Sequence, residues 1–414
     1  MPRSENFIAI IEQGVFSATQ FFSGIIVART TPKEQFGLYA LATTIVLFLV
    51  GMQTSLILMP YTIYAIRLKG KDRACYNGST LLHQIWLSAS AGTLLLFIGI
   101  FLPRTLSPRG SSLIIPSLAG TVPFILLLNH VRRVLFADLR FMSALVVSIL
   151  SGFFQIGGLM LLAYCHLLSA TTAYWMIGSS CGVVSIVWLV CNKNDYSLNF
   201  GQATSALRLN WSQGKWIFGG SMISSISTYL YPWFLATFQG VAEAGTFAAC
   251  QNVANLPNPF LLSVSNILRP KTALAFTNGG PVLLMRLVKR STLKIALVMG
   301  LYLTLMLIGG EWLTFQIYGS KYVGTGQVVL VLAIGLFAFA VTAPYGYGLI
   351  AMERADINFR ITITCSLPAI LLGLFLIRTY GSIGAAYSLL TFNGAVLIAC
   401  FILFAGIVRP KQTK

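Results

Sequence analysis

Residues 36–60 read FGLYALATTIVLFLVGMQTSLILMP, an apolar stretch without a single charged side chain. A helix needs about 20 apolar residues to cross the hydrocarbon core of a bilayer. The stretch lacks the apolar–polar alternation of a barrel strand, and only helices and closed barrels satisfy their backbone groups in lipid. It therefore predicts a transmembrane helix.

The rest of the chain has the same character. Its 414 residues are 56% hydrophobic and 9% charged, with a mean hydropathy of +0.80, whereas soluble domains carry about 25% charged residues. This composition excludes an ordinary soluble enzyme, a disordered chain and a disulfide-stapled secreted domain. We predict an all-α polytopic membrane protein with about twelve transmembrane helices, at residues 7–28, 36–60, 80–102, 112–130, 142–165, 170–191, 215–237, 244–267, 292–313, 326–350, 359–378 and 383–407.

Positive charge is concentrated in alternate loops of this scheme. The loops on the side of the two termini hold 22 of the 28 Lys and Arg residues. Because such residues accumulate on the cytoplasmic side, both termini are expected to be cytoplasmic. The same asymmetry accounts for the net charge of +18, so we predict no nucleic-acid partner.

The longest polar stretch, 192–214, is predicted to be a cytoplasmic linker. It separates an N-terminal six-helix lobe, residues 1–191, from a C-terminal six-helix lobe, residues 215–414. A second cytoplasmic stretch, 269–294, is basic and partly amphipathic. It fits either contact with anionic lipid headgroups or an ordinary positive-inside loop.

Short patterns recur between the two halves at matched loop positions. The pairs are 37–40 with 245–248 at an offset of 208, 136–141 with 354–359 at 218, and 173–174 with 386–387 at 213. Since six spans are an even number, the two halves insert in the same orientation and are expected to be related by a pseudo-two-fold axis along the membrane normal. Transporters of this kind bind substrate between the halves and rock them for alternating access.

Several loops resemble those of a known family. They are Ile25–Arg29 with residues 32–40, Arg132–Ala137, Tyr318–Tyr322 and Tyr380–Ala386. Together they are similar to loops of the Wzx-like O-antigen and exopolysaccharide flippases. These form the polysaccharide transporter branch of the multidrug/oligosaccharidyl-lipid/polysaccharide exporter superfamily.

This resemblance implies a V-shaped pair of six-helix lobes in the bacterial plasma (inner) membrane. It also implies flipping of a polyprenyl-pyrophosphate-linked oligosaccharide from the cytoplasmic to the outer leaflet, for assembly of a surface polysaccharide. Membrane lipids, a polysaccharide polymerase and chain-length machinery are then the expected partners. Relatives that flip the peptidoglycan precursor carry several arginines in their early spans. Here only Arg29 lies near the first span, which argues against that substrate.

Ionisable and amide side chains inside the first span are the first candidates for function. Glu12 is an acid within a predicted span. Ionisable groups are costly in lipid, and those that occur in spans typically have a function. Glu12 is a candidate for H⁺ or Na⁺ coupling; alternatively, it lies near enough to the interface to meet water or Arg3. Gln20 follows on the same helix as a candidate for substrate binding. Arg29, at the outer end, suits a pyrophosphate or an interface anchor equally.

Cytoplasmic arginines form the second set of candidates. Arg132, Arg133 and Arg140 surround Asp138 after the fourth span, and Arg354 lies at the matching place in the second half. They are suited to meet the pyrophosphate first, because arginine binds such groups through paired hydrogen bonds. The alternative is positive-inside charge with local ion pairs.

Polar and aromatic residues of the seventh and eighth spans are candidates for binding sugars. Gln251, Asn252 and Asn255 fall on one helical face, just before a proline-containing break. Their alternative role is hydrogen bonding between helices. Tyr229 and Trp233 offer aromatic faces for stacking, or alternatively form a packing or interface belt.

Enzyme functions have less support. His83, His130 and His166 lack catalytic or metal-ligand partners at suggestive spacing, and the cysteines show no metal spacing. We therefore predict no catalytic residues, no metal and no resident cofactor. Two other functions stay open: an ion-coupled exporter of small amphiphiles, and a membrane polymerase acting on lipid-linked glycans.

Overall fold

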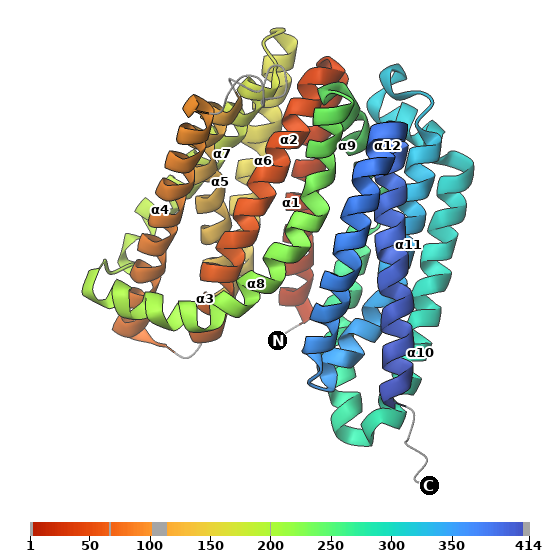
Figure 1. The fold of residues 1–414 in the computed structure, drawn as a ribbon. Coiled ribbons are helices and arrows are strands. Elements are labelled where there is room, and N and C mark those ends of the chain that lie inside the picture. Colours follow the sequence, from red (N-terminus) through yellow and green to blue (C-terminus); the bar gives the residue numbers. More distant parts are fainter. Residues whose placement is uncertain (1–2, 66–67, 102–113, 199, 409–414) are drawn as a thin grey trace. The chain divides into compact units, whose positions relative to one another are not determined.

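The computed structural model describes residues 3–65, 68–101, 114–198 and 200–408, and all regular secondary structure in these ranges is helical (Figure 1). The expected outer-loop arginines Arg104 and Arg109 lie outside the described residues. Six crossings come from the first half of the chain. They are α1 (Arg3–Thr30), α2 (Lys33–Gln53) continued by a π turn (Thr54–Leu58) and α3 (Met59–Tyr64), α4 (Gly70–Phe101), α5 (Ile114–Ala137), α6 (Phe141–Tyr164) and α7 (Ala170–Cys191).

The second half has fewer but longer helices. After a 3-10 turn (Lys193–Asp195) they are α8 (Phe200–Phe238), α9 (Val241–Ala254), α10 (Asn258–Tyr318), a 3-10 turn (Ser320–Tyr322), α11 (Gly326–Ala351) and α12 (Ala355–Val408). A straight helix of 61 residues like α10 would be about 90 Å long, three times a hydrocarbon core. It is instead broken at Gly279 and Gly280, and α12 is broken at Gly381.

Both breaks use a conformation that favours glycine. Gly280 has a φ of +58° and Gly381 a φ of +60°, in the left-handed region that side chains with a Cβ rarely adopt. Each long helix is therefore two antiparallel crossings joined by a tight turn. With these breaks, and with α9 and the first part of α10 counted together as one crossing, the described helices supply twelve crossings. The prediction of an all-helical multi-pass membrane protein is confirmed. Nine segments of the described chain are long and apolar enough to span a membrane as they stand, two of them long enough for two crossings.

The chain divides into two compact units, Met1–Tyr229 and Leu230–Lys414. The dividing point falls inside α8. Residues from Phe200 onward, which belong to the expected cytoplasmic linker, are part of this helix. The predicted division into lobes and linker stays a prediction.

In the first unit, α1 packs chiefly against α6, while α5 packs against α4 and α7. Glu12 meets Ser148, and further along Ser23 meets Gln155. The residue numbers rise together, so α1 and α6 run in the same direction. This is the direction that the predicted topology gives to the first and fifth spans.

A glycine permits this close contact. A Cβ at Gly152 of α6 would lie 2.5 Å from Thr19 Oγ1, whereas a Cβ at Gly157 on the same helix would meet nothing within 4 Å. We expect Gly152→Val to lower the stability of the protein by about 1–3 kcal/mol through overpacking. The matched Gly157→Val variant should melt like the wild type. Thermal unfolding in detergent checks both, and equal melting of the two variants would contradict this packing.

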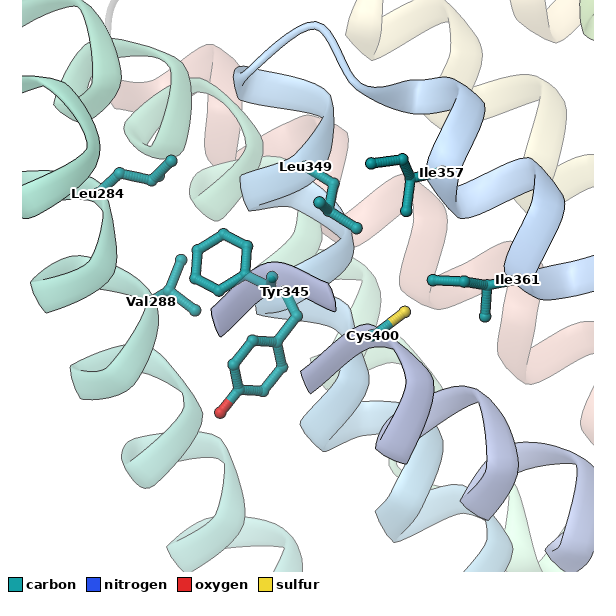
Figure 2. Packing of buried hydrophobic residues seen from close by; sticks show 8 residues of the cluster. Leu284, Val288, Tyr345, Leu349, Ile357, Ile361 and Cys400 are labelled. Atoms are coloured by element: carbon teal, nitrogen blue, oxygen red, sulfur yellow. The ribbon is translucent and has the colours of Figure 1, made fainter. Parts of the chain in front are cut away.

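The second unit is held by a compact apolar cluster (Figure 2). Leu284 and Val288 of α10 are fully buried and pack with residues of α11 and α12. The other members are Tyr345, Leu349, Ile357, Ile361, Cys400 and Phe404. In lipid such packing acts through van der Waals contact, and it orients one face of α10 toward the interior of the unit.

The internal repeat is visible in the turns. After α5, Asp138 N donates to Val134 O and Arg140 N to Leu135 O, while Leu139 has a φ of +58°. After α11 the same pattern recurs: Met352 N donates to Gly348 O, Arg354 N donates to Leu349 O, and Glu353 has a φ of +60°. The offset is 214, so the predicted offset of 218 is wrong here by about one helical turn. Asp138 corresponds to Met352 rather than to Asp356.

A second pair of contacts supports the offset of 208. Gln35 Oε1 in α2 accepts from Ala170 N at the start of α7 (3.0 Å). Glu243 Oε1 in α9 accepts from Ser382 N, just after the break in α12 (3.1 Å). Gln35 and Glu243 are 208 residues apart, so each unit ties its second crossing to its sixth in the same way.

Candidate functional site

A buried ion pair joins three helices of the first unit. Glu12 of α1 is fully buried, and its Oε1 lies 2.7 Å from both Nε and Nη2 of Arg132 in α5. Ser148 of α6 donates its hydroxyl to the same oxygen at 2.5 Å. Arg132 of α5 and Ser148 of α6 thus both bind the carboxylate of Glu12 in α1.

Arg132 is enclosed on its other side by an aromatic ring. Its guanidinium carbon lies 3.5 Å from the ring centroid of Phe16, one turn after Glu12 on α1. Only about a tenth of the Arg132 side chain is exposed. A cation–π contact of this kind stabilises a desolvated cation by roughly 2 kcal/mol, so Arg132 is held by charge and by the ring together.

The second carboxylate oxygen, Glu12 Oε2, is buried and has no hydrogen-bond partner in the described part of the chain. An unsatisfied buried oxygen is costly, and much more so when it carries charge. This oxygen is the one acceptor position of the carboxylate that the described residues leave open.

The same face of α1 continues as a polar seam against α6. Gln155 Nε2 donates to Ser23 Oγ (2.8 Å), which in turn donates to Thr19 O (2.7 Å). A different face of α1 carries Gln13 and the predicted residue Gln20, and both are exposed. Amides facing lipid are unfavourable, so this second face is suited to water or to a polar substrate.

The predicted arginine cluster after the fourth span is divided between two places. Arg132 turns inward to Glu12, and Arg133 beside it is half-buried. Asp138 instead pairs with Arg73 of α4, and Arg140 Nη1 lies 3.1 Å from Asp195 Oδ2. The physical reason is that α5 continues to Ala137, beyond the predicted end at residue 130, so that Arg132 lies within the helix.

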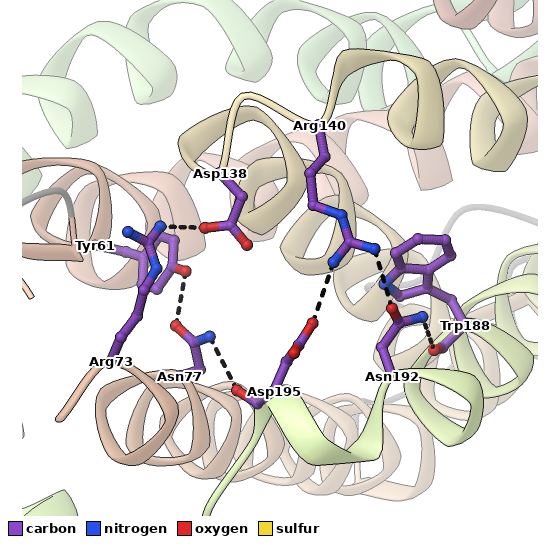
Figure 3. Close-up of polar contacts among 8 residues, drawn as sticks. All are labelled: Tyr61, Arg73, Asn77, Asp138, Arg140, Trp188, Asn192 and Asp195. Carbon is purple, nitrogen blue, oxygen red and sulfur yellow. Dashed lines mark hydrogen bonds and ion pairs between the residues drawn. The ribbon is translucent and has the colours of Figure 1, made fainter. Parts of the chain in front are cut away.

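Asp138 and Arg140 line a pocket of about 730 Å³ near the ends of α4, α5 and α7. Figure 3 shows the polar contacts beside it. Asn77 Nδ2 donates to Asp195 O (3.0 Å), and Tyr61 donates its hydroxyl to Asn77 Oδ1 (2.8 Å). Burial raises the pKa of Asp138, although the Arg73 guanidinium beside it acts in the opposite direction. The network ties together loops that are far apart in sequence.

The remaining predicted residues lie elsewhere. Arg29 is exposed in the last turn of α1, and Arg354 forms an exposed local ion pair with Asp356 (3.3 Å). Tyr229 ends the first unit, whereas Trp233 belongs to the second and is half-buried. Arg354 and Trp233 thus belong to the second unit, whereas the Glu12 site lies in the first.

The amides predicted to bind sugars end α9. Gln251 and Asn255 are half-buried and Asn252 is exposed. At the break before α10, Tyr302 donates its hydroxyl to the carbonyls of Val253 and Ala254, each at 3.0 Å. The carbonyls freed by the break are thus partly satisfied, and Asn252 lies within hydrogen-bonding reach of the Tyr318 hydroxyl.

Several site residues escaped the sequence analysis. Phe16 and Ser148 are ordinary span residues by composition, and nothing in the sequence connects them with Glu12. Buried Gln53 was also missed; its Nε2 donates to Gln84 Oε1 and to Leu126 O, each at 2.6 Å. The sequence does show an amide within an apolar span at this position. In the structure this amide forms hydrogen bonds between helices.

Comparison with known proteins places this chain in a family. The family model described as "Polysaccharide biosynthesis protein" matches residues 5–270, which include Glu12, Arg132 and Ser148. The chain has no significant match among curated protein sequences.

Three solved structures illustrate the fold. An inward-facing multidrug resistance MATE family transporter of the MOP superfamily is 13% identical, with a TM-score of 0.71 over 98% of this chain and 100% of that one. Lipid II flippase MurJ, in an inward closed conformation, is 16% identical, with a TM-score of 0.72 over 94% and 87%. A MOP superfamily transporter from Pyrococcus furiosus is 14% identical, with a TM-score of 0.64 over 99% and 95%. With its family match over most of its length, this chain belongs to the polysaccharide biosynthesis protein family and has the fold of the MOP superfamily transporters.

Proposed function

We propose that this transporter flips a polyprenyl-pyrophosphate-linked oligosaccharide from the cytoplasmic to the outer leaflet of the plasma membrane by alternating access. The family description supports a role in polysaccharide biosynthesis. A flippase for a lipid-linked precursor shares the fold. Neither of these fixes the cargo, so the proposal depends on what the Glu12 site can do.

The observation that carries the proposal is the buried guanidinium of Arg132, held by a carboxylate that has a free oxygen. Arginine is the side chain best suited to a pyrophosphate, because its planar fork donates paired hydrogen bonds. Protonation of Glu12 releases Arg132 to bind the pyrophosphate, and deprotonation restores the ion pair and expels it. A proton needs only the one free oxygen, whereas a metal cation needs several oxygen ligands, so H⁺ is the favoured coupling ion.

The other exposed polar residues suit the remaining parts of such a cargo. Gln13 and Gln20 on α1, and Asn252 at the end of α9, offer amide donors and acceptors to sugar hydroxyls. Arg140 at the pocket near the ends of α5 and α7 suits the pyrophosphate on the cytoplasmic side. Arg29 suits it on the outer side, where the loop that follows α1 is predicted to lie.

The test is the lipid-linked glycan pool of cells depleted of this protein. We expect a polyprenyl-pyrophosphate oligosaccharide to accumulate in the cytoplasmic leaflet while the surface polymer disappears. Single repeat units that reach the outer face but stay unpolymerised would instead identify a polymerase. An unchanged glycan pool, together with a changed sensitivity to small amphiphiles, would identify an exporter.

Arg29 gives a separate test of the outer end of the path. If its charge meets the pyrophosphate, Arg29→Ala should reduce transport by about tenfold, since hydrogen bonds to charged groups contribute about 1.5–3 kcal/mol. Arg29→Lys should retain more activity. Flux per molecule of purified protein in vesicles measures the difference, and equally mild effects of the two variants would show that Arg29 is only an interface anchor.

A further inference from the structure

The second part of α10 presents a lipid-facing stripe that ends in two arginines. Its exposed apolar residues are Leu293 (62% exposed), Leu297 (66%), Leu301 (65%), Leu305 (57%) and Ile308 (81%). At 100° per residue these residues share one face of the helix. The opposite face holds the buried residues Leu284, Val288 and Ile295 (Figure 2 shows the first two). The stripe therefore points away from the interior of its unit.

The length of the stripe places the membrane boundary. From Leu293 to the exposed Trp312 (63%) the helix rises about 29 Å, close to the hydrocarbon thickness of about 30 Å. Tryptophan is typical of the interface between lipid and water. Leu293 therefore lies at the cytoplasmic edge of the hydrocarbon, and the residues before it lie at the level of the headgroups.

Arg286 and Arg290 continue the same stripe into the headgroup region. Each lies within about 20° of the direction of Leu297 around the helix axis, and about 5–10 Å beyond Leu293. Both are exposed, and neither forms an ion pair with an acidic side chain of the described residues. Since they lie on a lipid-facing stripe, their neighbours at this depth are lipid headgroups.

The segment that carries these arginines has only positive charge. The stretch 269–294 holds six Lys and Arg residues and no Asp or Glu. The loop in the first half between the second and third crossings differs, because its Arg73 is paired with Asp138. A phosphate group is thus the natural counterion of the α10 stripe.

We propose that Arg286 and Arg290 form a binding site for an anionic phospholipid of the cytoplasmic leaflet, with the acyl chains lying along Leu293 and Leu297. Arginine supplies paired hydrogen bonds to the phosphate, and the leaflet supplies negative surface charge. This site is separate from the Glu12 site and does not depend on the proposed cargo.

The experiment compares phosphatidylglycerol with phosphatidylcholine for binding to the purified full chain in detergent, by native mass spectrometry. The wild type should prefer phosphatidylglycerol. Arg286→Gln/Arg290→Gln should weaken its binding by about tenfold or more, since each basic residue adds to the electrostatic attraction for an anionic lipid. The matched control is Lys271→Gln/Lys289→Gln, which removes two exposed charges of the same hairpin. Around the helix axis Lys289 lies about 60° from Arg286 and about 100° from Arg290. The control variant should retain the preference.

Two results would overturn the proposal. If both double variants lose the preference equally, the hairpin supplies only general positive charge. If Arg286→Gln/Arg290→Gln keeps the preference but loses transport of the lipid-linked glycan, the arginines belong to the substrate path. If Arg286→Gln/Arg290→Gln loses phosphatidylglycerol binding while the glycan pool of the cells is unchanged, the arginines bind lipid independently of the cargo of the transporter.

Discussion

Arg132→Gln is expected to destabilise the protein by about 3–5 kcal/mol and to abolish transport. The variant leaves Glu12 as a buried carboxylate without its cation, and breaking one side of a buried ion pair costs about that much. Ser148 alone remains as a partner for Glu12 Oε1. Thermal unfolding of the purified protein in detergent measures the first effect, and flux in vesicles measures the second.

The double variant Glu12→Gln/Arg132→Gln separates folding from function. With both charges removed, stability should return toward that of the wild type, while transport should stay absent. Arg140→Gln is the control, because its ion pair with Asp195 is 40–50% exposed and should contribute less than about 1 kcal/mol. A double variant as unstable as Arg132→Gln alone would mean that the two residues do not act as a pair.

Most of the fold could be predicted from sequence, because a lipid environment leaves the chain few options. Apolar runs such as 36–60 must be helices, and alternate loops must carry the positive charge. The ends of helices were less predictable. The span predicted at 112–130 continues as α5 to Ala137, because the turn at Leu139, and not the first charged residue, ends the helix.

That difference of seven residues decides which residues meet in the candidate site. Glu12 could be predicted, since an acid inside an apolar span is conspicuous. Its partner Arg132 was assigned to a cytoplasmic loop, whereas it lies within α5 and points to α1. The contact joins residues 120 positions apart, and it depends on how α1, α5 and α6 pack together. No local pattern in the sequence encodes this register.

The pocket lined by Asp138 and Arg140 shows the same limit. Asp138 and Arg140 were predicted as neighbours of Arg132 in one cluster. Their actual partners are Arg73 and Asp195, which come from α4 and from the turn after α7. The sequence predicts on which side of the membrane a charge lies, but it does not predict which charges on that side form ion pairs.

Glu12→Gln is expected to leave the protein folded and to remove its response to a pH gradient. The glutamine carbonyl can still accept from Ser148 and Arg132, so the contacts among α1, α5 and α6 are retained. The side chain can no longer take up a proton. A pH difference of one unit supplies about 1.4 kcal/mol per proton, so gradient-driven transport should fall by about tenfold under that gradient.

The measurement is transport of the lipid-linked glycan in vesicles, with and without an imposed pH difference, for wild type and variant. Glu12→Asp keeps a titratable group and should keep part of the pH response. Glu311→Gln is the matched control for the chemical change, because Glu311 is exposed and accepts from Gly324 N near the end of α10. A Glu12→Gln variant that still responds to the gradient as the wild type does would exclude Glu12 as the coupling site, while leaving Arg132 available to bind the pyrophosphate.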